Sequence, residues 1–212
     1  MRSLVVERER VQEVALLAIL RAKYQRQLTT INSHSPYPHQ VPPAGDWTYW
    51  LLEGGRGSGK TEAGARWLDG KAREANGRRL AVVAPTLNDA VETCVQGVSG
   101  LLAVNPAIRF LQPHTLIWPN GSRARLFGAY LPEDVERFRG PQHHYAWCDE
   151  LAAWRFLEQV WPQFRLGLRL GERPQAAITT TPKPRPQYKE IRRDPGTVRA
   201  HATTRDNPAL AQ

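Results

Sequence analysis

The chain has 212 residues, 41% of them hydrophobic, and a formal net charge of +9. This length accommodates one large domain, or a domain with an appendage, whose core needs no disulfide or metal for stability. The two cysteines, Cys94 and Cys148, stand in apolar surroundings without CxxC spacing, so we expect reduced thiols. The longest apolar stretch near the start, residues 14–20, is too short to span a bilayer and does not resemble a signal peptide, which predicts a soluble intracellular protein.

The positive charge is spread along the chain rather than confined to one tail. Basic residues are prominent at Arg78, Arg79, Arg123, Arg125, Lys183, Arg185, Arg192 and Arg193. Such a surface attracts phosphate backbones regardless of base sequence, so we interpret it as a contact surface for nucleic acid. A basic face that is merely solvated is the alternative.

The first 46 residues divide into two segments before the main domain. Apolar residues in 1–32 recur close to the helical period, with no interior glycine or proline in the first thirty, which predicts an N-terminal helical segment. Residues 33–46 contain four prolines and Gly45, so we expect an extended lead-in without regular structure.

The segments after residue 47 alternate between strands and helices. An apolar run at 50–52 breaks into glycines, and 62–73 resumes as a helix former. Residues 80–84 predict a second buried strand, stopped by Pro85, with a helical segment from Asn88 onward. The runs 116–118 and 123–127 flank Pro-Asn-Gly, which predicts a hairpin at a sheet edge.

Two further apolar runs end in polar residues. Tyr145–Cys148 leads into two acids, and Ala176–Thr179 leads into threonines and a proline, so both are predicted to be parallel strands. The pattern favours an α/β fold: a mostly parallel, right-handedly wound sheet flanked by helices, with ligands at the carboxyl ends of the strands. We predict that this core covers residues 47–205.

A phosphate-binding loop lies between the first strand and its helix. The segment satisfies G-x-x-x-x-G-K-S/T with Gly54, Gly55, Arg56, Gly57, Ser58, Gly59, Lys60 and Thr61. Glycines let successive N–H groups turn inward around phosphates, Lys60 reaches the β and γ phosphates, and Thr61 offers its hydroxyl to Mg²⁺. The sequence therefore predicts an ATP site; a glycine-rich turn without a ligand is the alternative.

An acid pair ends the strand at 145–148. A metal between the β and γ phosphates needs an anionic holder, and an attacking water needs a base. We assign Asp149 to the Mg²⁺ and Glu150 to the water, although a pair that caps the next helix is the alternative. Their separation from Lys60 leaves room for an intervening strand, as in the additional-strand, catalytic-glutamate branch of P-loop NTPases.

Two other groups of residues could face the γ phosphate. Arg56 could reach it in cis, while Arg137 or Arg139 could serve a neighbouring subunit in trans, or simply form surface salt bridges. The hydroxyls of Thr179, Thr180 and Thr181 could sense the phosphate, or could satisfy nearby backbone groups before Pro182.

The order of these motifs resembles the ATPase domain of tailed-phage large terminase subunits, which move double-stranded DNA into procapsids. The resemblance runs from about Gln40 to Asn207 and rests on Gly45–Trp47, Trp50–Thr61, Glu136–Gln142, Ala146–Leu151 and Thr179–Pro182. It implies that Arg56 is the phosphate-loop arginine, that Arg139 rather than Arg137 is offered to the adjacent subunit, and that Thr179–Thr181 is the coupling motif. It also implies that Gln40 is similar in place to residues that touch adenine.

The resemblance extends to cofactors and partners. It implies ATP with Mg²⁺, double-stranded DNA, a portal protein ring, a small terminase subunit and a homo-oligomeric ring docked on the procapsid in the host cytoplasm. Full-length large terminases continue into a nuclease domain that the chain lacks, so we expect residues 206–212 to begin the linker to it and expect no DNA cutting.

Other P-loop functions are weighed against this one. A complete helicase would need a second RecA-like lobe, for which the residues after Pro182 leave no room, so the alternative is another nucleic-acid translocase or a helicase fragment from which that lobe was removed. A nucleotide-dependent assembly module with little hydrolysis is disfavoured by Glu150, and a GTPase by the lack of an Asn-Lys-x-Asp segment.

Overall fold

The computed structural model describes residues 35–112 and 114–207. The predicted helical segment 1–32 lies outside these residues. Contacts divide the chain into Met1–Ser35 and Pro36–Gln212, and the fold below is that of the second unit.

An eight-stranded sheet organises this unit. Its strands are β1 (Tyr49–Gly54), β2 (Arg79–Ala84), β3 (Arg109–Leu111), β4 (Thr115–Ile117), β5 (Arg123–Gly128), β6 (Tyr145–Asp149), β7 (Gln175–Thr180) and β8 (Thr197–Ala202). They lie in the order β3-β4-β5-β2-β6-β7-β1-β8. The six strands from β5 to β8 in this order are parallel to one another, while β4 is antiparallel to both β3 and β5.

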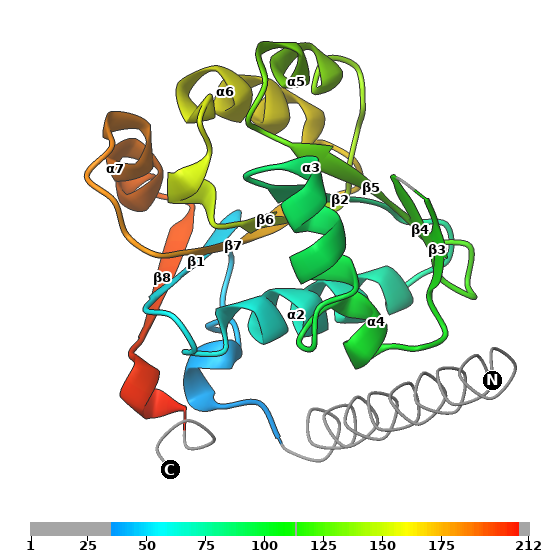
Figure 1. Cartoon of the computed structure of the whole chain (residues 1–212), viewed down its shortest axis with the longest axis horizontal. Helices are drawn as coiled ribbons and strands as arrows, with labels where there is room; N and C mark the ends of the chain where they lie inside the picture. Colours follow the sequence, from blue (N-terminus) through cyan, green and yellow to red (C-terminus); the bar gives the residue numbers. More distant parts are fainter. Residues whose placement is uncertain (1–34, 113, 208–212) are drawn as a thin grey trace, which may run out of the picture. The chain divides into compact units, whose positions relative to one another are not determined.

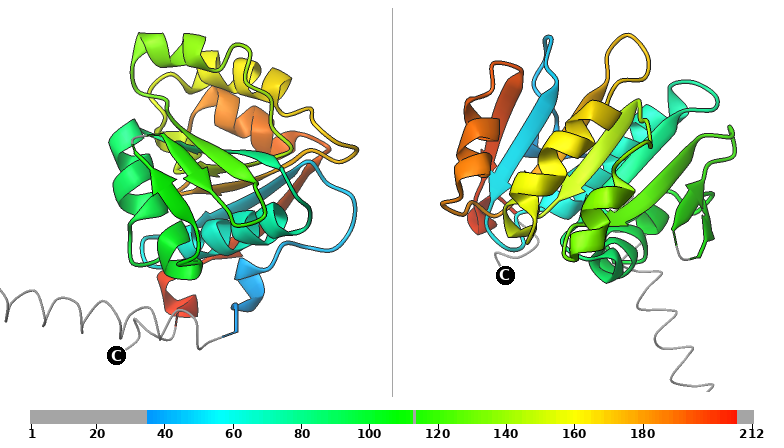
Figure 2. Two further views of the ribbon diagram at one scale, coloured as in Figure 1. Left: turned by 90° about the vertical axis from the view of Figure 1, so that its right-hand side faces the viewer. Right: turned by 90° about the horizontal axis from the view of Figure 1, so that it is seen from above.

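Helices cover both faces of the sheet (Figures 1 and 2). The longer ones are α2 (Lys60–Arg73), α6 (Leu157–Gly167) and α7 (Pro186–Arg193), with shorter α3 (Leu87–Asp89), α4 (Leu101–Val104) and α5 (Pro132–Arg137). A π-helix, η2 (Ala90–Val95), continues α3, and the 3-10 turns are η1 (Pro38–Gln40), η3 (Leu151–Ala153) and η4 (Thr204–Asp206).

Alternating side chains of the central strands pack into two separate hydrophobic cores, one on each face of the sheet. Trp50 and Trp147 point to the core under α2 and η2, while Leu51 and Cys148 point to the core under α6 and α7. All four are fully buried. A strand covered on both faces reads as a continuous apolar run, which explains why the central strands were recognisable in the sequence.

The topology confirms the predicted parallel sheet and its intervening strand, because β7 lies between β1 and β6. The prediction for the hairpin needs correction: β4 and β5 form it, but β3 is the outer strand and β5 is interior. The lead-in also contains regular structure at η1, where Gln40 is buried. In the described residues, no helix has the length and apolarity needed to cross a membrane.

Candidate nucleotide-binding and hydrolysis site

The predicted phosphate loop connects β1 to the first turn of α2. Gly57 and Gly59 have φ angles of 76° and 83°, in the left-handed region that favours glycine, and these two residues let the loop turn tightly. Lys60 is buried, and its Nζ donates to the backbone oxygen of Gly55 at 2.8 Å. The lysine charge is thereby held across the loop, where a phosphate oxygen could replace the carbonyl as its partner.

Gln40 packs against the same loop. Its Nε2 donates to the Gly59 oxygen at 3.1 Å, and its Oε1 accepts from the Tyr37 backbone N–H at 2.9 Å. A Cβ atom at Gly59 would lie 2.4 Å from Gln40 Nε2, so a larger residue there would displace the Gln40 amide from the loop. The structure therefore places Gln40 beside the loop; its contact with adenine stays a prediction.

Asp149 ends β6 and is buried beside its cross-strand partner Thr179. The Thr179 hydroxyl lies 2.7 Å from Asp149 Oδ1, and the indole N–H of Trp147 lies 2.8 Å from the same hydroxyl oxygen. Because an indole nitrogen can only donate, Thr179 must accept from Trp147 and give its single proton to Asp149. The three residues form a relay of fixed direction, which we call the Trp147 relay.

Burial raises the pKa of Asp149 to about 6, against the lowering effect of the Thr179 hydrogen bond. The Cys94 thiol, from η2, also donates to this carboxylate, and burial followed by the Asp149 charge raises the pKa of Cys94 well above its usual range. Among the described residues, no Lys, Arg or His forms an ion pair with Asp149. A desolvated carboxylate of this kind is suited to a divalent cation.

Thr61, in the first turn of α2, is the second residue that the sequence assigns to a metal, and it is half-buried. Mg²⁺ is commonly bound through one or two protein oxygens together with phosphate oxygens and water. One buried carboxylate and one hydroxyl beside a phosphate loop are donors that fit this mode of Mg²⁺ binding.

Glu150 follows Asp149 in the left-handed conformation, with φ of 45°. The carboxylates of the two residues have different partners. Glu150 Oε2 accepts from the Thr181 N–H at 3.0 Å, its Oε1 accepts from the Thr181 hydroxyl at 3.3 Å, and the same Oε1 lies 3.7 Å from Lys60 Nζ. Its side chain makes no capping bond to η3, which removes the capping alternative for this residue.

The three threonines at the end of β7 have three different partners. Thr179 is committed to Asp149, and Thr181 holds Glu150. Thr180 accepts from the backbone N–H of Ala152 at 3.0 Å, so only this hydroxyl primarily serves the backbone. The segment therefore contacts both acids, which the sequence alone did not predict.

The candidate arginines lie at the surface. Arg56 is exposed at the tip of the phosphate loop. Arg139, just after α5, pairs with Glu136 at 3.0 Å, and both side chains are more than 60% exposed. Arg137 pairs similarly with Asp134 at 3.2 Å. The structure brings none of these guanidinium groups into an ion pair with Glu150 or Asp149, so their roles stay predictions.

A phosphate loop between β1 and α2, with β7 inserted between β1 and the acid-bearing β6, defines a P-loop NTPase fold of the additional-strand type. The family described as "Terminase large subunit, T4likevirus-type, N-terminal" matches residues 51–211. The chain belongs to this family.

Solved structures support the same fold. A large terminase from a thermophilic bacteriophage matches with a TM-score of 0.65 and 15% identity over 83% of this chain, and the same protein in complex with ADP matches with a TM-score of 0.62 and 16% identity over 89%. The ATPase domain of the Thermus phage P74-26 large terminase matches with a TM-score of 0.58 and 20% identity over 82% of this chain and 83% of that domain.

The chain spans about half of the first two structures, 48% and 46% of their lengths. No curated protein matches the chain. At these identities the likeness establishes the fold alone.

Proposed function

We propose that this domain hydrolyses Mg·ATP and is the motor part of a large terminase that drives double-stranded DNA into a procapsid. The observation that carries this proposal is the position of Glu150. Its carboxylate is held by Thr181 within 3.7 Å of the phosphate-loop lysine, one residue beyond a buried acid suited to Mg²⁺. A module that only binds nucleotide would need no such base.

Each residue has a defined part in this chemistry. The inward N–H groups of Gly54–Thr61 and the start of α2 bind the phosphates, and Lys60 exchanges its carbonyl partner for the β and γ phosphates. Thr61 and Asp149 would hold Mg²⁺, which supplies neutralising charge when bound. Glu150 orients the attacking water and accepts its proton.

The two arginines and Gln40 complete the proposed site. Arg56 extends from the loop to the γ phosphate in cis, whereas Arg139 is offered to the neighbouring subunit of a ring, with its surface exposure in support. One hydrogen of the Gln40 side-chain amide binds the Gly59 oxygen, and the other would contact adenine. The portal ring, the small terminase subunit and the host cytoplasm belong to the same proposal.

The hydrolysis assignment can be tested with three variants. Lys60→Ala should abolish nucleotide binding, and Glu150→Gln should retain binding but hydrolyse ATP at least a hundredfold more slowly. Mixing Arg139→Ala subunits with Glu150→Gln subunits should restore part of the activity, because sites then form that combine Glu150 with a neighbour's Arg139. Arg137→Ala is the matched control, since it removes a similar ion pair nearby. Wild-type turnover in Glu150→Gln would refute the base.

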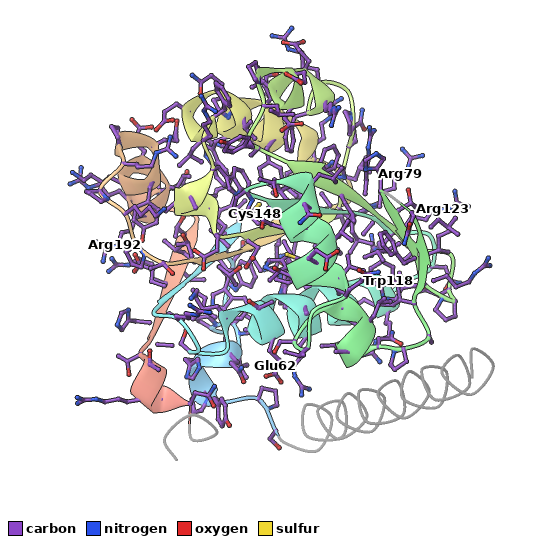
Figure 3. All side chains as sticks on the ribbon, in the orientation of Figure 1. Glu62, Arg79, Trp118, Arg123, Cys148 and Arg192 are labelled. Carbon is purple, nitrogen blue, oxygen red and sulfur yellow. The ribbon has the colours of Figure 1, made fainter. Side chains whose placement is uncertain are left out.

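A group of arginines supplies a surface for DNA. Arg79, Arg123 and Arg109 occupy one row across the sheet, because Arg79 pairs with Arg123 and both Arg123 and Arg109 pair with Ile117. Arg125 lies two residues after Arg123 and therefore on the same face, where it stacks over Phe127 at 5.1 Å. Figure 3 shows Arg79 and Arg123 together on adjacent strands.

These four arginines, which we call the arginine row, are exposed. Within the described part of the chain, none of them forms an ion pair with an acid. Unpaired guanidinium groups on an open sheet face can each contact a backbone phosphate. We assign the DNA-contacting surface to this row.

The salt dependence of DNA binding distinguishes a contact at the arginine row from a general attraction of DNA to the positive charge of the protein. Replacing Arg79 and Arg123 by glutamine should reduce the slope of log K against log salt for duplex DNA by about 2, because each phosphate contact contributes about 0.9. Lys189 and Arg193 on α7, replaced together, remove the same charge from a different surface. Equal slopes for the two double variants would exclude the arginine row as the specific contact.

A further inference from the structure

Four successive carbonyl groups of the phosphate loop are bound from outside the loop. The contacts are Thr204 Oγ1 to Arg56 O at 2.8 Å, Asn207 Nδ2 to Gly57 O at 2.7 Å, His39 Nε2 to Ser58 O at 2.9 Å, and Gln40 Nε2 to Gly59 O at 3.1 Å. Two come from the segment before β1 and two from the segment after β8. No sequence motif assigned a role to Thr204.

These contacts bear on the shape of the loop. The C=O and N–H groups of one peptide plane point in nearly opposite directions. Holding consecutive carbonyl oxygens on the outside therefore favours N–H groups on the inside, which is the arrangement that receives phosphate. Because bonds made before binding reduce the ordering cost of binding, they should raise nucleotide affinity without touching the nucleotide.

The position of the second segment is set by the sheet. β8 pairs in parallel with β1, and Ala202 is the register partner of Gly54, so the chain leaves β8 beside the start of the loop. A tight turn follows, in which Asp206 Oδ2 accepts from both the N–H and the hydroxyl of Thr203. This turn places Thr204 and Asn207 at neighbouring carbonyls.

We propose that residues 203–207 form an exit clamp, in which Thr204 and Asn207 are positioning residues that hold the phosphate loop ready for nucleotide. The proposal rests on the proposed function only for the identity of the ligand. Since coupling between two sites is reciprocal, nucleotide in the loop should stabilise the exit clamp by the same free energy that the clamp adds to binding.

Conservative variants of the full chain test the clamp. Thr204→Val removes the hydroxyl at nearly constant volume, and Thr204→Ser keeps it; Asn207→Ala removes the second bond. Affinity for Mg·ADP should fall about two- to tenfold in Thr204→Val and again in the double variant with Asn207→Ala, since a hydrogen bond is worth about 0.5–1.5 kcal/mol. Thr204→Ser should restore wild-type affinity.

Thr197→Val is the matched control. Its hydroxyl donates to the Ile191 backbone oxygen at 2.7 Å, at the start of β8, whereas the clamp follows the end of that strand. This variant should bind Mg·ADP as the wild type does. If the Thr204→Val, Asn207→Ala double variant retained wild-type affinity, or if Thr204→Ser bound as weakly as Thr204→Val, the clamp would be refuted.

Hydrogen exchange keeps the test independent of catalysis. In the nucleotide-free protein, amides of residues 57–60 should exchange faster in the double variant than in Thr197→Val, whether or not the protein hydrolyses ATP. Unchanged loop exchange would overturn the clamp by itself. If wild-type protein failed to bind nucleotide while the double variant loosened the loop, the proposed function would fail and the clamp would stand.

Discussion

The Trp147 relay makes an experimentally separable contribution to the site. Trp147 and Trp50 are both fully buried in the core under α2. The indole N–H of Trp147 is bonded to Thr179 at 2.8 Å, whereas that of Trp50 has no hydrogen-bond partner among the described residues. Trp147→Phe and Trp50→Phe therefore remove the same group from the same core, with and without a partner.

The difference in stability follows from this contrast. Both variants leave a cavity, so that cost largely cancels. Trp147→Phe loses a buried hydrogen bond worth about 1 kcal/mol, while Trp50→Phe removes an unpaired buried N–H whose desolvation costs about 1–3 kcal/mol. We expect Trp147→Phe to have a free energy of unfolding about 2–4 kcal/mol below that of Trp50→Phe.

A second consequence concerns the metal. Without the Trp147 donor, the Thr179 oxygen loses one of the contacts that fix its position beside Asp149. Loss of a group bonded directly to a metal ligand typically lowers metal affinity about 10- to 100-fold, and because Trp147 acts one bond further out, we expect a loss of about tenfold or less. Calorimetry of ADP binding with and without Mg²⁺ should show a loss of the Mg²⁺-dependent part only in Trp147→Phe. Equal unfolding energies and equal Mg²⁺ dependence in both variants would refute the relay.

Two further predictions concern residues around the same sheet. A Cβ at Gly64 would lie 2.3 Å from the Trp147 indole nitrogen, whereas a Cβ at Gly70 on the same helix meets nothing within 4 Å. Urea unfolding should therefore show that Gly64→Ala is destabilised by about 1–3 kcal/mol and that Gly70→Ala is stabilised by up to about 1 kcal/mol. Destabilisation of both variants would contradict this prediction. Burial, then the Arg125 charge, lowers the pKa of His143 to about 4 from 6.5. The contribution of neutral His143 to the free energy of unfolding, about 3 kcal/mol at most, is present above pH 6.5 and is lost as the pH falls toward 4. The stability of the wild type relative to His143→Phe should therefore decrease over that interval. A pH-independent difference would disprove this prediction.

The sequence predicted the central strands and the phosphate loop because both are local patterns. The apolar runs of β1, β2, β6 and β7 are buried on both faces, and each was identified from its own residues. The loop motif specifies its own turn through glycines with positive φ. Neither inference needed contacts between distant parts of the chain.

The remaining elements depend on such contacts. Helix α6 contains Pro162, which ordinarily argues against a helix interior, yet it packs Trp161 and Phe164 into the core. Strand β8 has a largely half-exposed sequence and is fixed by pairing with β1. The Trp147 relay joins residues on two strands, so the sequence placed Trp147 in an apolar run and in a family motif but did not predict its bond to Thr179.

The position of β7 in the sheet explains why Asp149 and Glu150 both contact the same segment, the end of β7. Because β7 lies beside β6, Thr179 reaches Asp149, and because Thr181 follows the last residue of β7, it reaches Glu150. Glu150 in turn lies 3.7 Å from Lys60, the first residue of α2. A displacement at the end of β7 would therefore move two carboxylates together: that of Glu150, the proposed base, and that of Asp149, which we propose binds magnesium. A strand order with β1 directly beside β6 would offer no shared partner of this kind.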